Sequence, residues 1–145
     1  MEERRRAFIR RINRLTSEMD ALYHQSSLRL GITDSVSVVL YAIYEAGGAC
    51  PIGDICQQWG VRKQTVNSAL RRLEEEGILR LEQHTGRAKR AVLTDRGRDY
   101  VQQTAARLYE AEVRAFDTWP EEDVETYIRL MERYAACFRR QVEAL

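Results

Sequence analysis

The chain has 145 residues, of which 44% are hydrophobic and 31% are charged, and its formal net charge is +1. This composition can supply a hydrophobic core, which excludes a globally disordered chain. No apolar run approaches the roughly 18 residues that a membrane-spanning helix needs, and the start Met1–Arg6 lacks the apolar stretch of a secretory signal, so we expect a cytoplasmic protein. The three cysteines lack CxxC spacing, which argues against a disulfide framework and against a metal or other cofactor.

Positive charge is concentrated in one segment. Residues 62–98 hold ten basic and five acidic side chains, whereas residues 1–61 hold seven of each and residues 99–145 hold six basic and ten acidic. An excess of five positive charges can neutralise nucleic-acid phosphates, but it can also be an ordinary solvated surface. The helices and strands predicted for this segment distinguish a nucleic-acid-binding surface from an ordinary solvated one.

Two helices are expected at the N-terminal end. The first covers about residues 3–28, with apolar positions at alternating spacings of four and three, a heptad-like pattern that favours packing against another long helix. Gly31 ends this helix, and Thr33 can cap a second helix over about residues 34–45, which Gly47 and Gly48 terminate. The first stripe comprises Phe8, Ile12, Leu15, Met19, Leu22 and Ser26, and the second helix turns Val36, Val39, Leu40 and Ile43 inward.

The middle of the chain predicts two short helices separated by a tight turn. Pro51 opens the first of them, because its missing N–H costs little at a helix start, and Gly60 supplies the corner. The second helix covers about residues 62–76, and its opposite face is rich in side chains that form hydrogen bonds. The expected buried side chains are Ile52, Ile55 and Cys56 in the first helix and Val66, Leu70 and Leu73 in the second.

A hairpin follows, with strands expected at residues 78–82 and 90–93 and a turn that contains Gly86. Its tip, residues 84–90, is basic. Helix, tight turn, helix and basic hairpin together predict a winged helix-turn-helix. This architecture offers one helix to the major groove of DNA and a hairpin tip to the backbone or the minor groove.

The C-terminal part predicts two more helices. Thr94 can cap a long helix over about residues 95–116, and Pro120 fits the first turn of a last helix. The acidic residues 121–123 complement the positive end of that last helix. Apolar positions are Val101, Ala105 and Leu108 in the long helix and Val124, Tyr127 or Ile128, Met131, Tyr134, Phe138, Val142 and Leu145 in the last one.

The helices that flank the winged core, about residues 34–97, carry apolar stripes that need a partner. A second subunit would bury them and give a two-fold dimer with its two recognition helices about one DNA turn apart. The alternative is that these helices fold back on their own domain.

Two motifs are similar to those of the MarR family of bacterial transcriptional regulators. They are Val61-x-Lys-x-Thr-Val-x-x-x-Leu-x-x-Leu-Glu-x-x-Gly77 and Arg87-x-Lys-Arg-x-Val-Leu-Thr-Asp-x-Gly97, and the resemblance covers nearly the whole chain. It implies a single, mainly α-helical domain over residues 1–145. Residues 33–98 would form the DNA-binding lobe with its small β-hairpin wing, and residues 1–32 and 99–145 would form dimerisation helices. The implied function is a dimeric repressor that binds a near-palindromic operator and is released by a small, often aromatic, effector.

The resemblance also implies DNA-binding residues. Gln64 and Asn67 would pair with adenine edges, while an arginine or lysine would take guanine. Arg71 and Arg72 would contact phosphates, and Arg87 would enter the minor groove with electrostatic support from its neighbours. The full set is Arg62, Lys63, Gln64, Thr65, Asn67, Ser68, Arg71, Arg72, Arg87, Lys89 and Arg90.

Three features depart from the family pattern. Thr85 stands where an acidic residue commonly orients the wing arginine, and the wing is short, so minor-groove contact is less secure than major-groove entry. Pro51 replaces the usual Ser or Thr cap, a local change.

An effector site in this family often lies between the dimerisation helices and the DNA-binding lobe. Candidates to line it are Tyr23, His24, Tyr41, Tyr44 and Tyr109, although tyrosines also commonly fill a helical core. Cys56 falls on the apolar side of its helix and Cys137 falls beside the last apolar stripe, which favours inert core cysteines. Two histidines, His24 and His84, are too few for zinc sensing.

Two other classes of function remain as alternatives. An enzyme is disfavoured, because the chain has no nucleophile elbow, phosphate-binding loop or metal triad. A protein-interaction module that uses the winged fold without reading DNA is the second alternative, and the salt dependence of duplex binding would separate it from a regulator.

Overall fold

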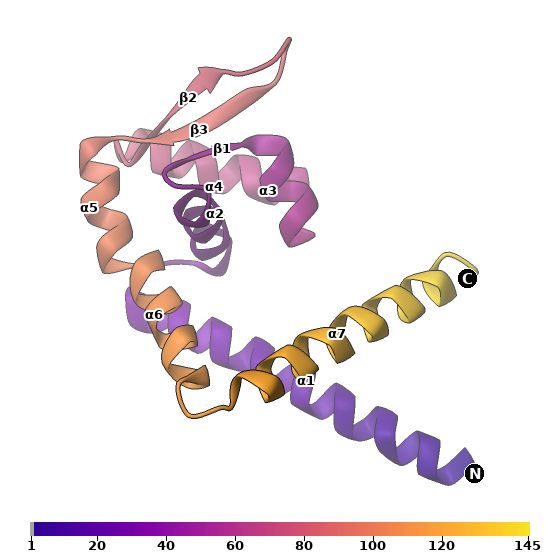
Figure 1. Ribbon diagram of the computed structural model, residues 1–145. Coiled ribbons are helices and arrows are strands. Elements are labelled where there is room, and N and C mark those ends of the chain that lie inside the picture. Colours follow the sequence, from indigo (N-terminus) through magenta and orange to yellow (C-terminus); the bar gives the residue numbers. More distant parts are fainter. Residues whose placement is uncertain (1) are drawn as a thin grey trace. The chain divides into compact units, whose positions relative to one another are not determined.

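Helices dominate the structure, a computed structural model that describes residues 2–145, and a small antiparallel sheet completes it (Figure 1). This confirms the expected fold class, a mainly helical winged helix-turn-helix. The elements are α1 Glu2–Leu30, α2 Asp34–Glu45, β1 Ala49–Pro51, α3 Ile52–Trp59, α4 Lys63–Glu75, β2 Leu79–Gln83, β3 Lys89–Leu93, α5 Asp95–Gln103, α6 Ala105–Phe116 and α7 Glu121–Val142.

The chain divides into two compact units. The first ends at Tyr109 and contains α1 to α5, the three strands and the start of α6, and the second is Glu110–Leu145, with the rest of α6 and α7. That residues 1–145 act as one domain stays a prediction. Along the part of the chain that the structure describes, no helix combines the length and apolarity needed to cross a membrane.

Local chemistry sets the bounds of α2. Gly31 has a φ of +71°, a left-handed conformation that ends α1, and the side chain of Thr33 accepts a hydrogen bond from the backbone N–H of Val36 at 3.3 Å. The bounds of α2 match the expected residues 34–45, and its four predicted inward residues are all buried.

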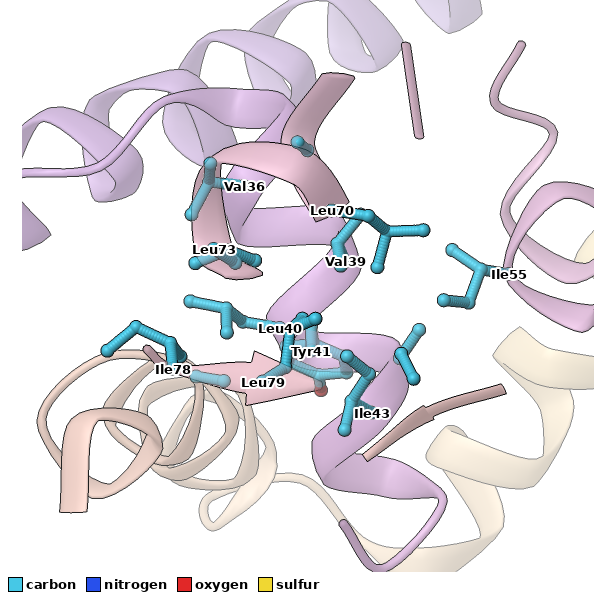
Figure 2. Close-up of a cluster of buried hydrophobic side chains, with 14 of the residues drawn as sticks. Val36, Val39, Leu40, Tyr41, Ile43, Ile55, Leu70, Leu73, Ile78 and Leu79 are labelled. Atoms are coloured by element: carbon cyan, nitrogen blue, oxygen red, sulfur yellow. The ribbon is translucent and has the colours of Figure 1, made fainter. Parts of the chain in front are cut away.

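The core lies where α2 packs against α4 and the neighbouring strands (Figure 2). Leu40 and Ile43 of α2, Ile55 of α3 and Leu73 of α4 are fully buried. Each such side chain contributes roughly 1.5–3 kcal/mol of transfer free energy. This cluster fixes which face of α4 points inward and therefore which face is free.

The sheet has three strands, where the sequence predicted two. Its order is β1-β3-β2, and β1 pairs antiparallel with β3, with Cys50 opposite Ala91. The three residues of β1 follow two glycines and end in proline, so they carry no alternating pattern. The hairpin strands lie within one residue of their expected bounds.

The predicted single helix over residues 95–116 is wrong, because it breaks at Thr104. The backbone there has φ −125° and ψ −90°, which ends α5 before α6 begins. The Thr104 hydroxyl donates to the carbonyl of Tyr100 at 2.8 Å, and its N–H donates to the carbonyl of Val101 at 3.2 Å. A threonine that bonds back to the preceding turn competes with the helix ladder and favours such a bend.

The apolar stripes of the terminal helices are exposed in the single chain. Phe8 and Leu15 of α1 are 54% and 53% exposed, and Met131 and Phe138 of α7 are each 55% exposed. Exposed apolar positions repeated at helical spacing indicate surfaces that another helix covers.

Candidate nucleic-acid interface

The turn between α3 and α4 is built on one glycine. Gly60 has a φ of +60°, and this left-handed residue ends α3 directly after Trp59. Arg62 then precedes the first residue of α4 in an extended conformation, without a side-chain cap. The tight turn lets both helices contribute to the same core.

Burial divides α4 into two faces. The inner face consists of the buried Val66, Ala69, Leu70 and Leu73, which pack into the core. All predicted DNA-contacting residues in this region lie on the exposed side, namely Arg62, Lys63, Gln64, Thr65, Asn67, Ser68, Arg71 and Arg72.

Two of these side chains have partners within α4. The hydroxyl of Ser68 donates to the carbonyl of Gln64 at 3.0 Å, and Nε of Arg72 donates to Glu76 at 3.0 Å. Both contacts are exposed, so a competing ligand can displace them at small cost. Among the described residues, Lys63 and Arg71 form no ion pair.

The wing ends in a short hydrogen-bonded turn. The N–H of His84 donates to Ala88 at 2.9 Å, the N–H of Ala88 donates to Thr85 at 2.9 Å, and the side-chain amide of Gln83 donates to the carbonyl of Gly86. Arg87 lies within this turn, exposed and without an ion pair within residues 2–145.

Arg90 differs from Arg87, because it is paired across the hairpin. Its Nε and Nη2 donate to Oε2 of Glu82 at 3.2 and 3.0 Å, and Nε of Arg80 donates to Oε1 of Glu82 at 2.8 Å. Hydrogen bonds from Arg80 and then Arg90 lower the pKa of the Glu82 carboxyl.

A groove joins the helical and hairpin parts of this surface. It has a volume of about 640 Å³ and lies between the start of α3, the first turns of α4 and the wing tip. Lys63 and Asn67 of α4 line it together with Arg87 and Lys89 of the wing. The fold thus brings together residues that lie 20 or more positions apart in the sequence.

Asp54 also lines this groove, and the sequence did not single it out. The only signal was an acidic residue in the first turn of a predicted helix, which is the usual place for one. A carboxylate beside a basic groove lowers affinity for phosphate locally, so it limits where an anionic partner can lie.

Four of the predicted effector residues have defined side-chain contacts. Tyr41 packs edge-on against Trp59 with ring centroids 5.2 Å apart, and Tyr44 packs against Tyr109 at 5.7 Å. His24 is hydrogen-bonded to Asp34 at 2.8 Å, a contact that lowers the pKa of the Asp34 carboxyl, with a further hydrogen bond from Ser27. Tyr23 is an exposed residue of α1. Their effector role stays a prediction.

The three cysteines occupy different environments. Cys50 is buried in β1, and burial raises the pKa of its thiol, with a further contribution from Asp54. Cys56 is half-buried beside the groove, whereas Cys137 is exposed on α7, so the expectation of a core position is wrong for Cys137 in the single chain. Residues 2–145 contain no cluster of three or more His, Cys, Asp or Glu side chains arranged to hold a metal.

A core-anchored polar helix beside a hairpin with a basic tip defines the class of winged helix-turn-helix proteins. Residues 30–91 match the family model described as MarR family. This segment, which holds the helix-turn-helix and most of the hairpin, is therefore similar to the MarR family. A search of curated proteins gives no match.

Solved structures of MarR family regulators share this fold. NMB1585 from Neisseria meningitidis superposes with a TM-score of 0.83 at 15% identity, covering 93% of this chain and 96% of that one. AbsC from Streptomyces coelicolor gives 0.74 at 19% identity over 92% and 93% of the chains. BpsR from Bordetella bronchiseptica, described with regulation of its DNA binding by 6-hydroxynicotinic acid, gives 0.66 at 18% identity over 86% and 98%.

Proposed function

We propose that this protein is a cytoplasmic transcriptional regulator that binds duplex DNA as a homodimer and represses the genes beside its operator. The observation that carries the proposal is the groove in which α4 and the wing tip present basic and amide side chains together. Nothing in this function needs a catalytic step or a cofactor. A winged protein-interaction module is the alternative, but it gives no reason for a basic wing tip facing a polar helix.

The exposed face of α4 suits the major groove. Gln64 and Asn67 carry amides, which can pair bidentately with the N6 and N7 edge of adenine, and Lys63 can donate to guanine. Thr65 and Ser68 supply hydroxyl groups, which can contact several different bases. Arg62, Arg71 and Arg72 extend the basic surface towards phosphates, with Arg72 leaving Glu76 when it does so.

The wing tip suits the backbone or the minor groove. Arg87 is exposed and unpaired among the described residues, and the wing turn holds it beside the groove. Lys89 lines the same groove and adds a positive charge to it. Arg90 does not line the groove, and its ion pair with Glu82 reduces the positive charge that it contributes to this surface.

The apolar stripes of α1 and α7 support the dimer. Burying Leu15 or Met131 against a second copy would remove apolar surface from water, which is the main favourable contribution to association. A two-fold dimer presents two copies of α4, and a two-fold protein fits a near-palindromic operator.

We also propose that a small aromatic molecule releases the DNA. BpsR is described with regulation of its DNA binding by 6-hydroxynicotinic acid, which is an aromatic molecule, and this chain offers aromatic residues on α1, α2 and α6. The candidates are Tyr23, His24, Tyr41, Tyr44 and Tyr109.

The deciding experiment measures binding to duplex DNA from the region upstream of the protein's own gene, with a scrambled duplex of equal length as control. Between about 50 and 200 mM salt, a regulator with several phosphate contacts should lose affinity by orders of magnitude. Equal binding to both duplexes at low salt would exclude a sequence-specific regulator.

Two substitutions separate base reading from phosphate contact. Asn67→Ala should relax base preference at one position in each half-site, by about 1–3 kcal/mol of discrimination. Arg71→Ala should weaken binding to all sequences and reduce the salt slope by about 1. Equal losses on every sequence for both variants would contradict this assignment.

Sedimentation equilibrium tests the dimer. Met131→Lys places a charge in the α7 stripe and should yield a monomer, because a charge buried in an apolar interface is strongly unfavourable. Glu132→Gln, which changes the charge equally at the next position, should leave the dimer intact. A dimer in both variants would show that this stripe is dispensable.

A further inference from the structure

The outer face of the wing carries a three-residue cluster of Arg80, Glu82 and Arg90. Side chains alternate between the two faces of a strand. Leu79 and Leu81 lie on the inner face of β2, so Arg80 and Glu82 lie together on its outer face. Glu82 lies directly opposite Arg90 in the register of β2 and β3. One carboxylate thus contacts both arginines, Arg80 through Oε1 and Arg90 through Oε2.

The carboxylate is the least exposed member of the cluster. The side chain of Glu82 is 31% exposed, against 57% for Arg80 and 44% for Arg90. Both of its oxygens are engaged, and its lowered pKa keeps it charged well below neutral pH. Two donors of Arg90, Nε and Nη2, are directed at Glu82 rather than outward.

The wing tip contrasts with this cluster. Arg87 and Lys89 line the groove beside α4 and form no ion pair among the described residues, although Lys89 directly precedes Arg90 on β3. The same short hairpin therefore holds two free cations and two arginines that share one carboxylate.

We propose that Glu82 is a positioning residue that withholds Arg80 and Arg90 from DNA phosphates, so that the wing binds DNA through Arg87 and Lys89 alone. This inference rests on the proposed DNA binding. Its consequence is a limit on sequence-independent affinity: phosphate contacts strengthen binding to every sequence alike, so limiting their number keeps binding to DNA outside the operator weak.

The test compares the wild-type protein with Glu82→Gln, which keeps the shape of the side chain and removes its charge. Binding to the operator and to a random duplex is measured from 50 to 200 mM salt. Each new phosphate contact steepens the slope of log K against log salt by about 0.9, so release of one or both arginines predicts a change of about 0.9–1.8. Affinity for random DNA and affinity for the operator should rise by about the same factor, because the new contacts are to phosphates.

Glu75→Gln is the matched control. Glu75 is exposed in the last turn of α4 and forms no ion pair within residues 2–145, so this variant changes the net charge equally without releasing an arginine. Its salt slope should equal that of the wild type. A slope that rises as much as in Glu82→Gln would trace the effect to net charge and overturn the proposal.

Arg90→Ala, alone and combined with Glu82→Gln, completes a double-mutant cycle. In the wild-type background it should leave the salt slope nearly unchanged, whereas in the Glu82→Gln background it should remove about 0.9 of the gain. An unchanged or shallower slope in Glu82→Gln, with urea unfolding showing an intact fold, would overturn the proposal. Failure of the wild type to bind any duplex would instead refute the proposed function.

Discussion

Replacing Gly97 by alanine tests how α5 is held against the wing. Gly97 is a buried residue in the first turn of α5, and a Cβ atom there would lie 1.8 Å from the carbonyl oxygen of Ile78 and 3.3 Å from a methyl carbon of Leu93. Ordinary contact begins at 3.4 Å, so the first distance is about 1.6 Å too short. The obstacle is backbone, which cannot rotate aside as a side chain can.

The magnitude follows from two opposing effects. Alanine favours a helix over glycine by about 1 kcal/mol, which alone would stabilise the variant. Overpacking costs about 1–3 kcal/mol and occasionally more. Moving Ile78 also strains the hydrogen bonds that Thr94 makes to it, at 3.1 Å from both N–H and hydroxyl, each contributing about 1 kcal/mol. We expect a net loss of about 3 kcal/mol in the free energy of unfolding.

Urea unfolding followed by circular dichroism, at one fixed protomer concentration, measures this loss. Gly53→Ala is the control, because Gly53 is also helical and a Cβ there meets nothing within 4 Å. That variant should be unchanged or more stable by up to about 1 kcal/mol. If Gly97→Ala were as stable as the wild type, the close approach of α5 to Ile78 would be refuted.

Two further substitutions test the core and the link between α1 and α2. Leu73→Ala removes a fully buried side chain of α4 and should cost about 2–5 kcal/mol in urea unfolding; a loss below about 1 kcal/mol would contradict its core position. Asp34→Asn removes the partner of His24. Because the folded-state pKa of Asp34 is lowered, its contribution is present above the ordinary value of 3.8 and is lost as the pH falls through the lowered pKa. The pair is exposed, so the difference between wild type and variant should be at most about 1 kcal/mol at pH 5.5 and should vanish near pH 2; a difference that grew on acidification would contradict the pairing.

Helix α4 shows how much of the fold the sequence predicted. Spacings of four and three predicted Val66, Leu70 and Leu73 as the buried face of α4, and the structure confirms all three. The polar face follows directly, since a helix that buries one side must expose the other. The prediction succeeded because its signals, periodicity and a glycine corner, are local.

In the wing, the sequence did not predict which arginine is paired and which is free. Arg87 and Arg90 are both arginines near a predicted turn, so composition alone cannot tell which of them is free to bind an anion. Only the register of β2 against β3 places Glu82 opposite Arg90 and leaves Arg87 free at the tip. The register of the two strands depends on the apolar pattern of the whole hairpin and on the geometry of its turn, so it cannot be predicted from any single residue.

By itself, the sequence determined helices α1 to α4 and α7, the caps at Thr33 and Thr94, the strands of the hairpin and the apolar stripes of the terminal helices. These features depend on side-chain periodicity, glycine conformation and hydrogen bonds over a few residues. The tertiary structure alone decided the pairing of β1 with β3, the contact of Tyr44 with Tyr109 and the groove between α4 and the wing. Each of these joins groups that are distant in sequence or set by packing, and such contacts form only when the whole core places them together.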